Sequence, residues 1–210
     1  DVALKKFGFK NKMVWHNDVE LPKSDLVVLP GGFSYGDYLR CGSMASKSKI
    51  MKSVINFANS GGMVMGICNG FQILVETGLV PGVLLRNKYL EFICKNVFIK
   101  INNKKNTYFK NIENKVLEFH IAHNEGNYFC TKDQLKEIED NEQVAINYCN
   151  KDGKNEEQFN PNGSLKNIAG IFNKEKNILG MMPHPERMID PSLSGEDGSL
   201  FFNNLINNLK

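Results

Sequence analysis

Short apolar runs alternate along the chain with segments whose apolar residues recur at helical spacing. Residues 25–29 and 63–67 are continuous runs rich in Val, Leu, Met and Ile, and they predict strands buried on both faces. Between them, residues 47–59 place their apolar side chains on one helical face, and Gly61 and Gly62 follow as a stop signal. The pattern therefore predicts a strand, a helix and a second strand in succession.

The pattern continues through Cys68 and then changes. Residues 70–77 predict a second helix that ends at Gly78, so a strand, a tight turn and a helix meet at Cys68. Farther along, apolar and polar residues alternate in 92–101 and 117–123, which is typical of antiparallel or edge strands. Three more short apolar runs predict strands at residues 144–148, 168–172 and 178–181.

Both ends of the chain predict helices. Residues 1–9 resemble the helix that would follow a strand, so the first strand of an α/β sheet is expected to lie outside this sequence or to be absent from the fold. Ser199 is placed to cap a closing helix. Its inward face is expected to carry Leu200, Phe201, Leu205 and Leu209. Because no repeat or linker interrupts the alternation, we expect one α/β domain over residues 1–210.

Composition and charge exclude several classes of function. Apolar residues make up 41% of the 210 residues and charged residues 23%, as in globular proteins. No apolar run approaches the roughly 18 residues of a membrane span, and the first residues lack the pattern of a secretory signal. A formal net charge of +3 with dispersed lysines does not indicate a nucleic-acid surface.

The cysteines indicate a reduced compartment. Their number is odd and no CxxC pair occurs, which argues against a disulfide framework and against a zinc knuckle. A cytoplasmic protein is therefore expected. Four of the five have no pattern that suggests chemistry and are predicted to be inert: Cys41, Cys94, Cys130 and Cys149.

Cys68 differs because glycines stand two residues before it and two after it. A nucleophile on a tight turn between strand and helix projects toward solvent, and flanking glycines remove side chains that would clash there. The turn also places the thiol at a helix N-terminus, where the dipole favours thiolate. The segment Gly66-Ile67-Cys68-Asn69-Gly70 satisfies both conditions. The alternative is a buried structural cysteine beside turn glycines.

A cysteine nucleophile needs a base, and His184 is the strongest candidate among four histidines. It lies between two prolines directly after an apolar strand, and Glu186 is near enough to orient its ring if the segment is extended. His16 is predicted to be a surface residue. His120 and His123 are three apart in a predicted strand, so they face opposite ways and do not suggest a shared metal.

Acyl chemistry also needs donors for an oxyanion. The backbone N–H of Asn69, just after the cysteine, and those of the glycine turn at Gly31 and Gly32 are suitable. The alternative for Pro30-Gly31-Gly32 is an ordinary turn at the end of a strand.

These pieces together resemble the class I (triad) glutamine amidotransferases. The pattern G-x-C-x-G-x-Q is matched by residues 66–72, the PGG loop by residues 30–32 and the H-P-E segment by residues 184–186. The resemblance implies an α/β fold with a mostly parallel, flavodoxin-like sheet and helices on both faces. It also implies hydrolysis of glutamine to glutamate and ammonia.

The resemblance implies roles for individual residues. Cys68 attacks the side-chain amide, His184 carries the proton to the leaving ammonia and Glu186 orients His184. Gly32 and Asn69 are implied as the oxyanion hole. The residues implied to hold glutamine are Gly31, Phe33, Gln72 and His123, with Glu125 and Tyr128 as further candidates. Two alternatives remain: Gln72 orients the loop, and the His123 segment is a structural turn around Gly126.

Longer stretches narrow the resemblance within the family. They are LPGGFSYGDYLRCG (29–42), GICNGFQIL (66–74), AHNEGNY (122–128), NPNGS (160–164) and GMMPHPER (180–187). They are similar to glutaminase subunits that pass ammonia to a synthetase, which converts formylglycinamide ribonucleotide to formylglycinamidine ribonucleotide in de novo purine biosynthesis. Two partners are implied, a small bridging subunit and the large, ATP-dependent synthetase subunit. ATP and magnesium are expected on the synthetase, and this chain is expected to hold no cofactor and no metal.

Two rival hypotheses remain at this point. One is another amidase of the same fold, such as the glutaminase of a different synthetase or a γ-glutamyl hydrolase. The other is a non-catalytic subunit that binds glutamine or regulates a partner. Asp37, Tyr38 and Arg40 are expected on the surface, either facing the synthetase or in a solvated loop.

Overall fold

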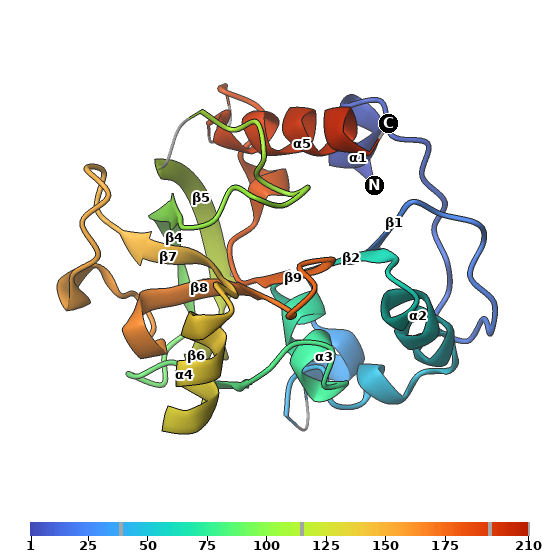
Figure 1. The fold of residues 1–210 in the computed structure, drawn as a ribbon, viewed down its shortest axis with the longest axis horizontal. Helices are drawn as coiled ribbons and strands as arrows, with labels where there is room; N and C mark the ends of the chain where they lie inside the picture. The colour runs from blue at the N-terminus through green and yellow to red at the C-terminus, as the bar shows by residue number, and fades with distance from the viewer. Residues whose placement is uncertain (38–39, 114–115, 193–194, 210) are drawn as a thin grey trace.

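A seven-stranded sheet with helices around it forms the fold (Figure 1). The computed structural model describes residues 1–37, 40–113, 116–192 and 195–209. The strands of the sheet are β1 (Leu26–Leu29), β2 (Met63–Ile67), β4 (Ile93–Ile101), β5 (Val116–His123), β7 (Val144–Cys149), β8 (Ile168–Phe172) and β9 (Ile178–Met181). A separate two-stranded sheet pairs β3 (Val83–Leu85) with β6 (Asn127–Phe129).

The helices lie on both sides of the strands in Figure 1, with α1 and α5 above and α3 and α4 below. They are α1 (Val2–Lys6), α2 (Lys49–Asn59), α3 (Asn69–Glu76), α4 (Lys132–Asp140) and α5 (Asp197–Asn208). The α/β class and the helices on both faces agree with the sequence prediction.

The expectation of a mostly parallel sheet is wrong. The strand order is β1-β2-β9-β8-β7-β4-β5, and only the β1–β2 and β2–β9 pairs are parallel. The β8–β9, β7–β8, β4–β7 and β4–β5 pairs are antiparallel. Strands β1 and β2 are parallel because α2 crosses between them, whereas β8 returns into β9 through a short turn that allows only antiparallel pairing. The sheet is therefore mixed.

Most predicted elements occur, and the terminal ones differ. Every strand predicted in the sheet is present within a residue or two, and the alternating segments β4 and β5 pair antiparallel as expected. The first helix is shorter than predicted and ends at Lys6.

The closing helix begins before Ser199, so the predicted cap is wrong. Glu196 occupies the cap position, because the carboxylate of Asp197 accepts a bond from the Glu118 N–H and Gly198 docks against Pro185. These contacts fix the cap of the helix three residues earlier than predicted. Leu200 is also not inward-facing: 43% of it is exposed, and Phe202 is buried instead.

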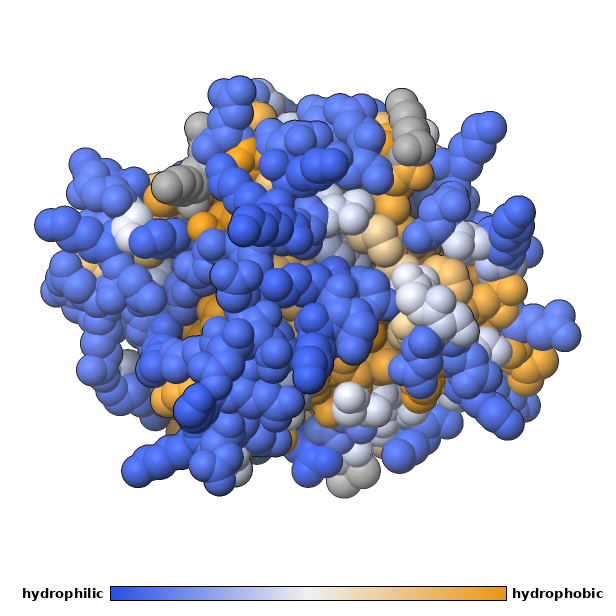
Figure 2. Space-filling model, viewed as in Figure 1, coloured by the Kyte–Doolittle hydropathy of each residue, from blue (hydrophilic) through white to orange (hydrophobic). Residues whose placement is uncertain are grey.

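Aromatic side chains fill the core between α5 and the sheet. Phe201 lies 5.6 Å from Phe109 and 6.4 Å from Phe119, ring centre to ring centre. The buried Tyr108 hydroxyl donates to the carbonyl of Val64 at 2.8 Å, which satisfies its polar end. Figure 2 shows a mainly hydrophilic face with scattered apolar patches. Within the described ranges, no helix is long and apolar enough to cross a bilayer.

The two glycines around Cys68 are required by close packing. A Cβ on Gly66 would lie 2.6 Å from the carbonyl oxygen of Gly70, and a Cβ on Gly70 would lie 1.9 Å from that of Leu29. Backbone atoms are therefore in close contact among three segments: the end of β1, the end of β2 and the first turn of α3. This packing brings Cys68 to the carboxyl edge of the parallel strands.

Gly70→Ala is expected to lower the free energy of unfolding by at least about 3 kcal/mol, because the Cβ meets backbone atoms and α3 must move. Urea denaturation measures the loss. Lys52→Ala, on the exposed side of α2, is the control and should leave the midpoint nearly unchanged. Equal stabilities of the two variants would show that α3 can move away from the Leu29 carbonyl without cost.

Candidate active site

Cys68 sits in a strained backbone conformation between β2 and α3. Its φ is 51° and its ψ is −106°, a combination that costs a non-glycine residue about 1–3 kcal/mol. Its N–H bonds the carbonyl of Met181 at the end of β9 (2.8 Å), and its Sγ lies 3.6 Å from the carbonyl of Ala122 in β5. The thiol is thus held where three strands converge. Such strain is typical of a nucleophile on a strand-to-helix turn.

Gly31 connects Cys68 to His184 in space. A Cβ on Gly31 would lie 2.7 Å from Cε1 of His184 and 3.5 Å from Cβ of Cys68. The thiol side chain, the imidazole and the glycine turn therefore border one small space. The two residues are 116 positions apart in the numbering, and the parallel pairing of β2 with β9 brings their strand ends together.

Glu186 fixes the tautomer of His184. The imidazole Nδ1 lies 2.5 Å from Glu186 Oε1, and a carboxylate can only accept, so Nδ1 carries the hydrogen. The lone pair of the neutral ring is then on Nε2, which is buried and has no hydrogen-bond partner among the described residues. A ring in this state is ready to take a proton at Nε2.

The backbone around His184 is held from two sides. Its N–H donates to the carbonyl of His120 in β5 at 2.7 Å. On the other side, Gly198 at the start of α5 packs against the Pro185 carbonyl so closely that a Cβ there would lie 1.9 Å from the oxygen. The H-P-E segment is therefore placed by β5 and α5 together.

The predicted oxyanion donors border the same region. Asn69 is the first residue of α3, where a helical N–H has no carbonyl one turn earlier to bond. Gly32 follows Gly31 with a φ of 150°, a conformation that a side chain disfavours. Phe33 is 67% exposed, and its ring centre lies 6.4 Å from that of Phe92.

Both polar atoms of the Gln72 side-chain amide form hydrogen bonds within the protein. Its Nε2 donates to the carbonyl of Glu125 at 2.8 Å, and its Oε1 accepts from Asn69 Nδ2 at 2.8 Å. The Glu125 carboxylate in turn accepts from the Cys41 N–H at 3.2 Å. These bonds fit the loop-orienting alternative better than direct contact with glutamine.

His123 is buried, and Asn87 holds its ring. Its Nδ1 lies 3.1 Å from Asn87 Oδ1, and its Nε2 has no partner in the described part of the chain. Asn87 also donates to the His123 carbonyl at 2.9 Å and accepts from the Gly126 N–H at 3.1 Å. The sequence interpretation missed Asn87 because nothing in its local pattern marks an asparagine that is 1% exposed.

The titration of His123 gives a stability prediction. Burial, with a further effect of His184, lowers its pKa from 6.5 to about 4. Between these values the unfolded chain binds a proton that the native protein excludes, so native stability falls as the pH falls from 6.5 toward 4. The total loss from this group is about 3 kcal/mol. We expect urea-derived stability to fall more steeply in this window for the wild type than for His123→Gln. If the stability of the two proteins changed with pH in parallel, the lowered pKa of His123 would be contradicted.

The remaining candidates fall outside the site or outside the description. Tyr128 is 1% exposed and donates its hydroxyl to the Pro81 carbonyl at 2.9 Å, which is a structural role. Tyr38 and the side chain of Asp37 lie outside the described residues. Arg40 has a mostly exposed side chain that forms an ion pair with Glu76. In the described ranges, no three His, Cys, Asp or Glu side chains are grouped to hold a metal ion.

Comparisons of sequence connect this site to known proteins. A family model described as CobB/CobQ-like glutamine amidotransferase domain matches residues 2–195. The phosphoribosylformylglycinamidine synthase subunit PurQ of Pelagibacter ubique is 80% identical over 210 residues, covering 100% of this chain and 92% of that protein. The subunit of the same name from Synechocystis sp. is 50% identical over 192 residues, covering 91% of this chain and 86% of that protein.

Solved structures give the same picture. A chain in the structure of PurLQS from Thermotoga maritima matches with a TM-score of 0.86 and 38% identity, covering 100% of this chain and 91% of that one. A glutamine amidotransferase from Thermotoga maritima matches with a TM-score of 0.57 at 16% identity, covering 91% of this chain and 82% of that one. At that identity the second match supports the fold alone.

Proposed function

The chain belongs to the CobB/CobQ-like glutamine amidotransferase family, and from this membership we propose how its thiol centre hydrolyses glutamine. Its α/β fold is that of the class I glutamine amidotransferases. The chain supplies the glutaminase activity of phosphoribosylformylglycinamidine synthase in purine biosynthesis. Its product, ammonia, goes to the synthetase step.

The first half of the reaction makes a thioester. His184 Nε2 accepts the thiol proton of Cys68, and the sulfur attacks the side-chain amide carbon of glutamine. The oxyanion that forms is stabilised by the N–H groups of Asn69 and Gly32. His184 then protonates the leaving nitrogen, and ammonia departs. What supports this order is the hydrogen bond from Nδ1 to Glu186, because it leaves Nε2 as the proton acceptor.

The second half hydrolyses the thioester. Water gives a proton to His184 Nε2 and attacks the thioester carbon, and glutamate leaves as the sulfur recovers its proton. Glu186 stabilises the imidazolium in both halves without itself taking a proton. Glutamine is held by the backbone of Gly31 and Phe33 together with His123, while Gln72 keeps the Glu125 loop in position.

The partners are PurL and PurS, the other components of the PurLQS complex. Ammonia made in this chain is used by the synthetase, where ATP and magnesium act. We expect ATP to bind the synthetase and not this chain, whose glycines do not match the pattern of a phosphate-binding loop. An odd number of cysteines without a CxxC pair supports a cytoplasmic location.

Reconstitution tests this function. The chain is mixed with PurL and PurS, and glutamate and formylglycinamidine ribonucleotide are measured with glutamine, ATP and formylglycinamide ribonucleotide present. One glutamate per product molecule is expected. The control omits this chain and supplies ammonium ions, which should still support synthesis. Glutamine-dependent synthesis at full rate without this chain would contradict the proposal.

A further inference from the structure

A second thiol lies beside an imidazole on the outer face of the β4–β5 pair. Asn96 and His120 are directly opposite in the register, and Cys94 is two residues before Asn96 on the same face. Cys94 Sγ is 3.4 Å from His120 Nε2, and His120 Nδ1 is 2.9 Å from Asn96 Oδ1. Cys94 and Asn96 are exposed, and His120 is half-buried. A nucleophile, a base and a group that orients the base therefore meet at the surface.

The hydrogen bonds fix the direction of proton transfer. The amide oxygen of Asn96 can only accept, so His120 Nδ1 carries the hydrogen and Nε2 accepts from the Cys94 thiol. Partial burial and the positive charge of Arg187 lower the pKa of His120, which keeps the ring neutral near pH 7. A neutral imidazole in this tautomer is a competent base for a thiol.

We propose that Cys94 is a second reactive thiol, which exchanges with low-molecular-weight disulfides of the glutathione type and uses His120 as its base. His120 takes the thiol proton, the Cys94 sulfur attacks one sulfur of the disulfide, and the disulfide bond breaks. The other sulfur leaves as a thiolate and receives the proton from His120. The products are a mixed disulfide at Cys94 and one small thiol, so atoms and electrons balance.

Other cysteines outside the active site lack these features. Burial raises the pKa of the Cys149 thiol to about 11 and also raises that of Cys130. Cys41 is 8% exposed. A small disulfide in water therefore meets Cys94 more readily than these three.

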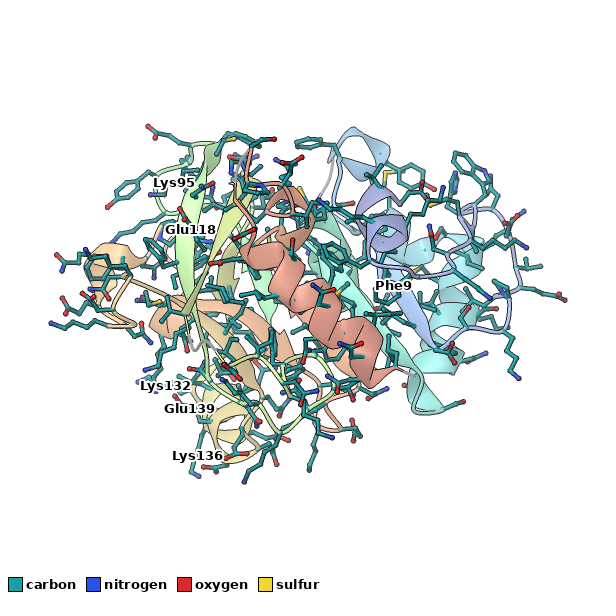
Figure 3. All side chains as sticks on the ribbon, turned by 90° about the horizontal axis from the view of Figure 1, so that it is seen from above. Phe9, Lys95, Glu118, Lys132, Lys136 and Glu139 are labelled. Atoms are coloured by element: carbon teal, nitrogen blue, oxygen red, sulfur yellow. The ribbon has the colours of Figure 1, made fainter. Side chains whose placement is uncertain are left out.

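The Cys94–His120 pair lies next to the backbone of the catalytic histidine, His184. The His120 carbonyl accepts a hydrogen bond from the His184 N–H, and the charges of Glu186 and Arg187 both affect the pKa of His120. Figure 3 shows the same strand pair from above, where Lys95 on β4 and Glu118 on β5 are labelled at the side of the molecule. A bulky mixed disulfide at Cys94 is expected to displace His120 and, with it, the backbone of His184. This consequence rests on the proposed glutaminase function.

The exchange itself is tested by mass, independently of activity. Full-length Cys68→Ala protein is treated with oxidised glutathione, and intact mass and peptide mapping follow the modification over time. One rapid addition at Cys94 is expected, absent in Cys68→Ala/Cys94→Ser. Adding His120→Gln should slow it at least tenfold, a conservative bound because a positioned base typically supplies about 10²-fold or more. Asn96→Ala, an exposed change that spares the core, should also slow it.

A nearby positive charge is the rival cause of thiol reactivity, and Lys95→Ala is the matched variant for it. We expect Cys94 in the Cys68→Ala/Lys95→Ala protein to be modified at the same rate as in the Cys68→Ala protein. Modification that depends on Lys95 and not on His120 would overturn the proposal, and so would equal modification of all the cysteines.

The consequence for activity is tested in the protein with Cys68 intact. Oxidised glutathione should lower glutamine hydrolysis about tenfold more in the wild type than in Cys94→Ser, and a reductant should reverse it. Equal inhibition of both proteins would overturn the link to His184. A complex with PurL and PurS that shows no glutaminase activity would contradict the proposed function and this link together, while the mass result would still decide the exchange.

Discussion

Cys68→Ala is expected to lower glutamine hydrolysis by at least about 10⁴-fold, since removing a nucleophile leaves only binding and oxyanion stabilisation. The change removes one sulfur atom from a residue that is 6% exposed, so the fold should persist. Synthesis by the complex from ammonium ions should continue at the wild-type rate. The measurement is glutamate formation by the complex, with ammonium-dependent synthesis measured in parallel.

Cys149→Ala is the matched control for this loss. It removes the same atom from another buried cysteine, which lies on β7 and has no part in the mechanism. Its glutaminase rate should stay close to that of the wild type. A Cys68→Ala complex that still hydrolyses glutamine at more than a tenth of the normal rate would show that another group is the nucleophile.

His184→Asn is expected to lower glutamine hydrolysis by roughly 10³-fold, because both proton transfers of the proposed mechanism pass through its ring. Glu186→Gln should have a smaller effect, about 10²-fold, since the imidazole remains and only its tautomer and charge stabilisation are lost. A third of the Glu186 side chain is exposed, so water can replace part of that stabilisation.

The order of these two losses distinguishes a base from its orienting group. Steady-state rates at saturating glutamine, with His16→Gln as the control at a histidine outside the site, give the comparison. His16→Gln should show no measurable change. A larger loss for Glu186→Gln than for His184→Asn would contradict the assigned roles.

Local patterns were sufficient for most of the sheet. The strands β2, β8 and β9 are continuous apolar runs, and such runs predict burial on both faces whatever their neighbours are. Pairing direction depends instead on which strands become neighbours, and only the tertiary structure decides that. The placement of β9 between β2 and β8 is the particular fact that the sequence does not carry.

Helix α4 was missed although its signal is present. Thr131 accepts from the Gln134 N–H at 3.2 Å, and Gln134 Oε1 accepts from the Thr131 N–H at 3.0 Å, which is a capping box. Leu135 and Ile138, one turn apart, are its only apolar residues that pack on the core, and a single such pair is a short pattern that a search for longer apolar repeats passes over.

The motif residues of the candidate site could be proposed from the sequence, whereas the residues that hold them in place could not. Cys68, His184 and Glu186 stand in motifs whose glycines and prolines mark unusual backbone. Asn87 and the His120 carbonyl act through contacts between distant segments, and a residue that works by such contacts has no local signature. For Gln72 the sequence left two roles open, and its two hydrogen bonds favour the one in which it orients a loop.

The central claim is that Cys68 is a thiol nucleophile specific for glutamine. Intact-mass analysis and peptide mapping after treatment with an electrophilic glutamine analogue, with and without PurL and PurS, test it most directly. We predict a single label on Cys68 that free glutamine suppresses and that His184→Asn reduces. An absence of label on Cys68 under both conditions, or labelling that glutamine does not suppress, would contradict the mechanism.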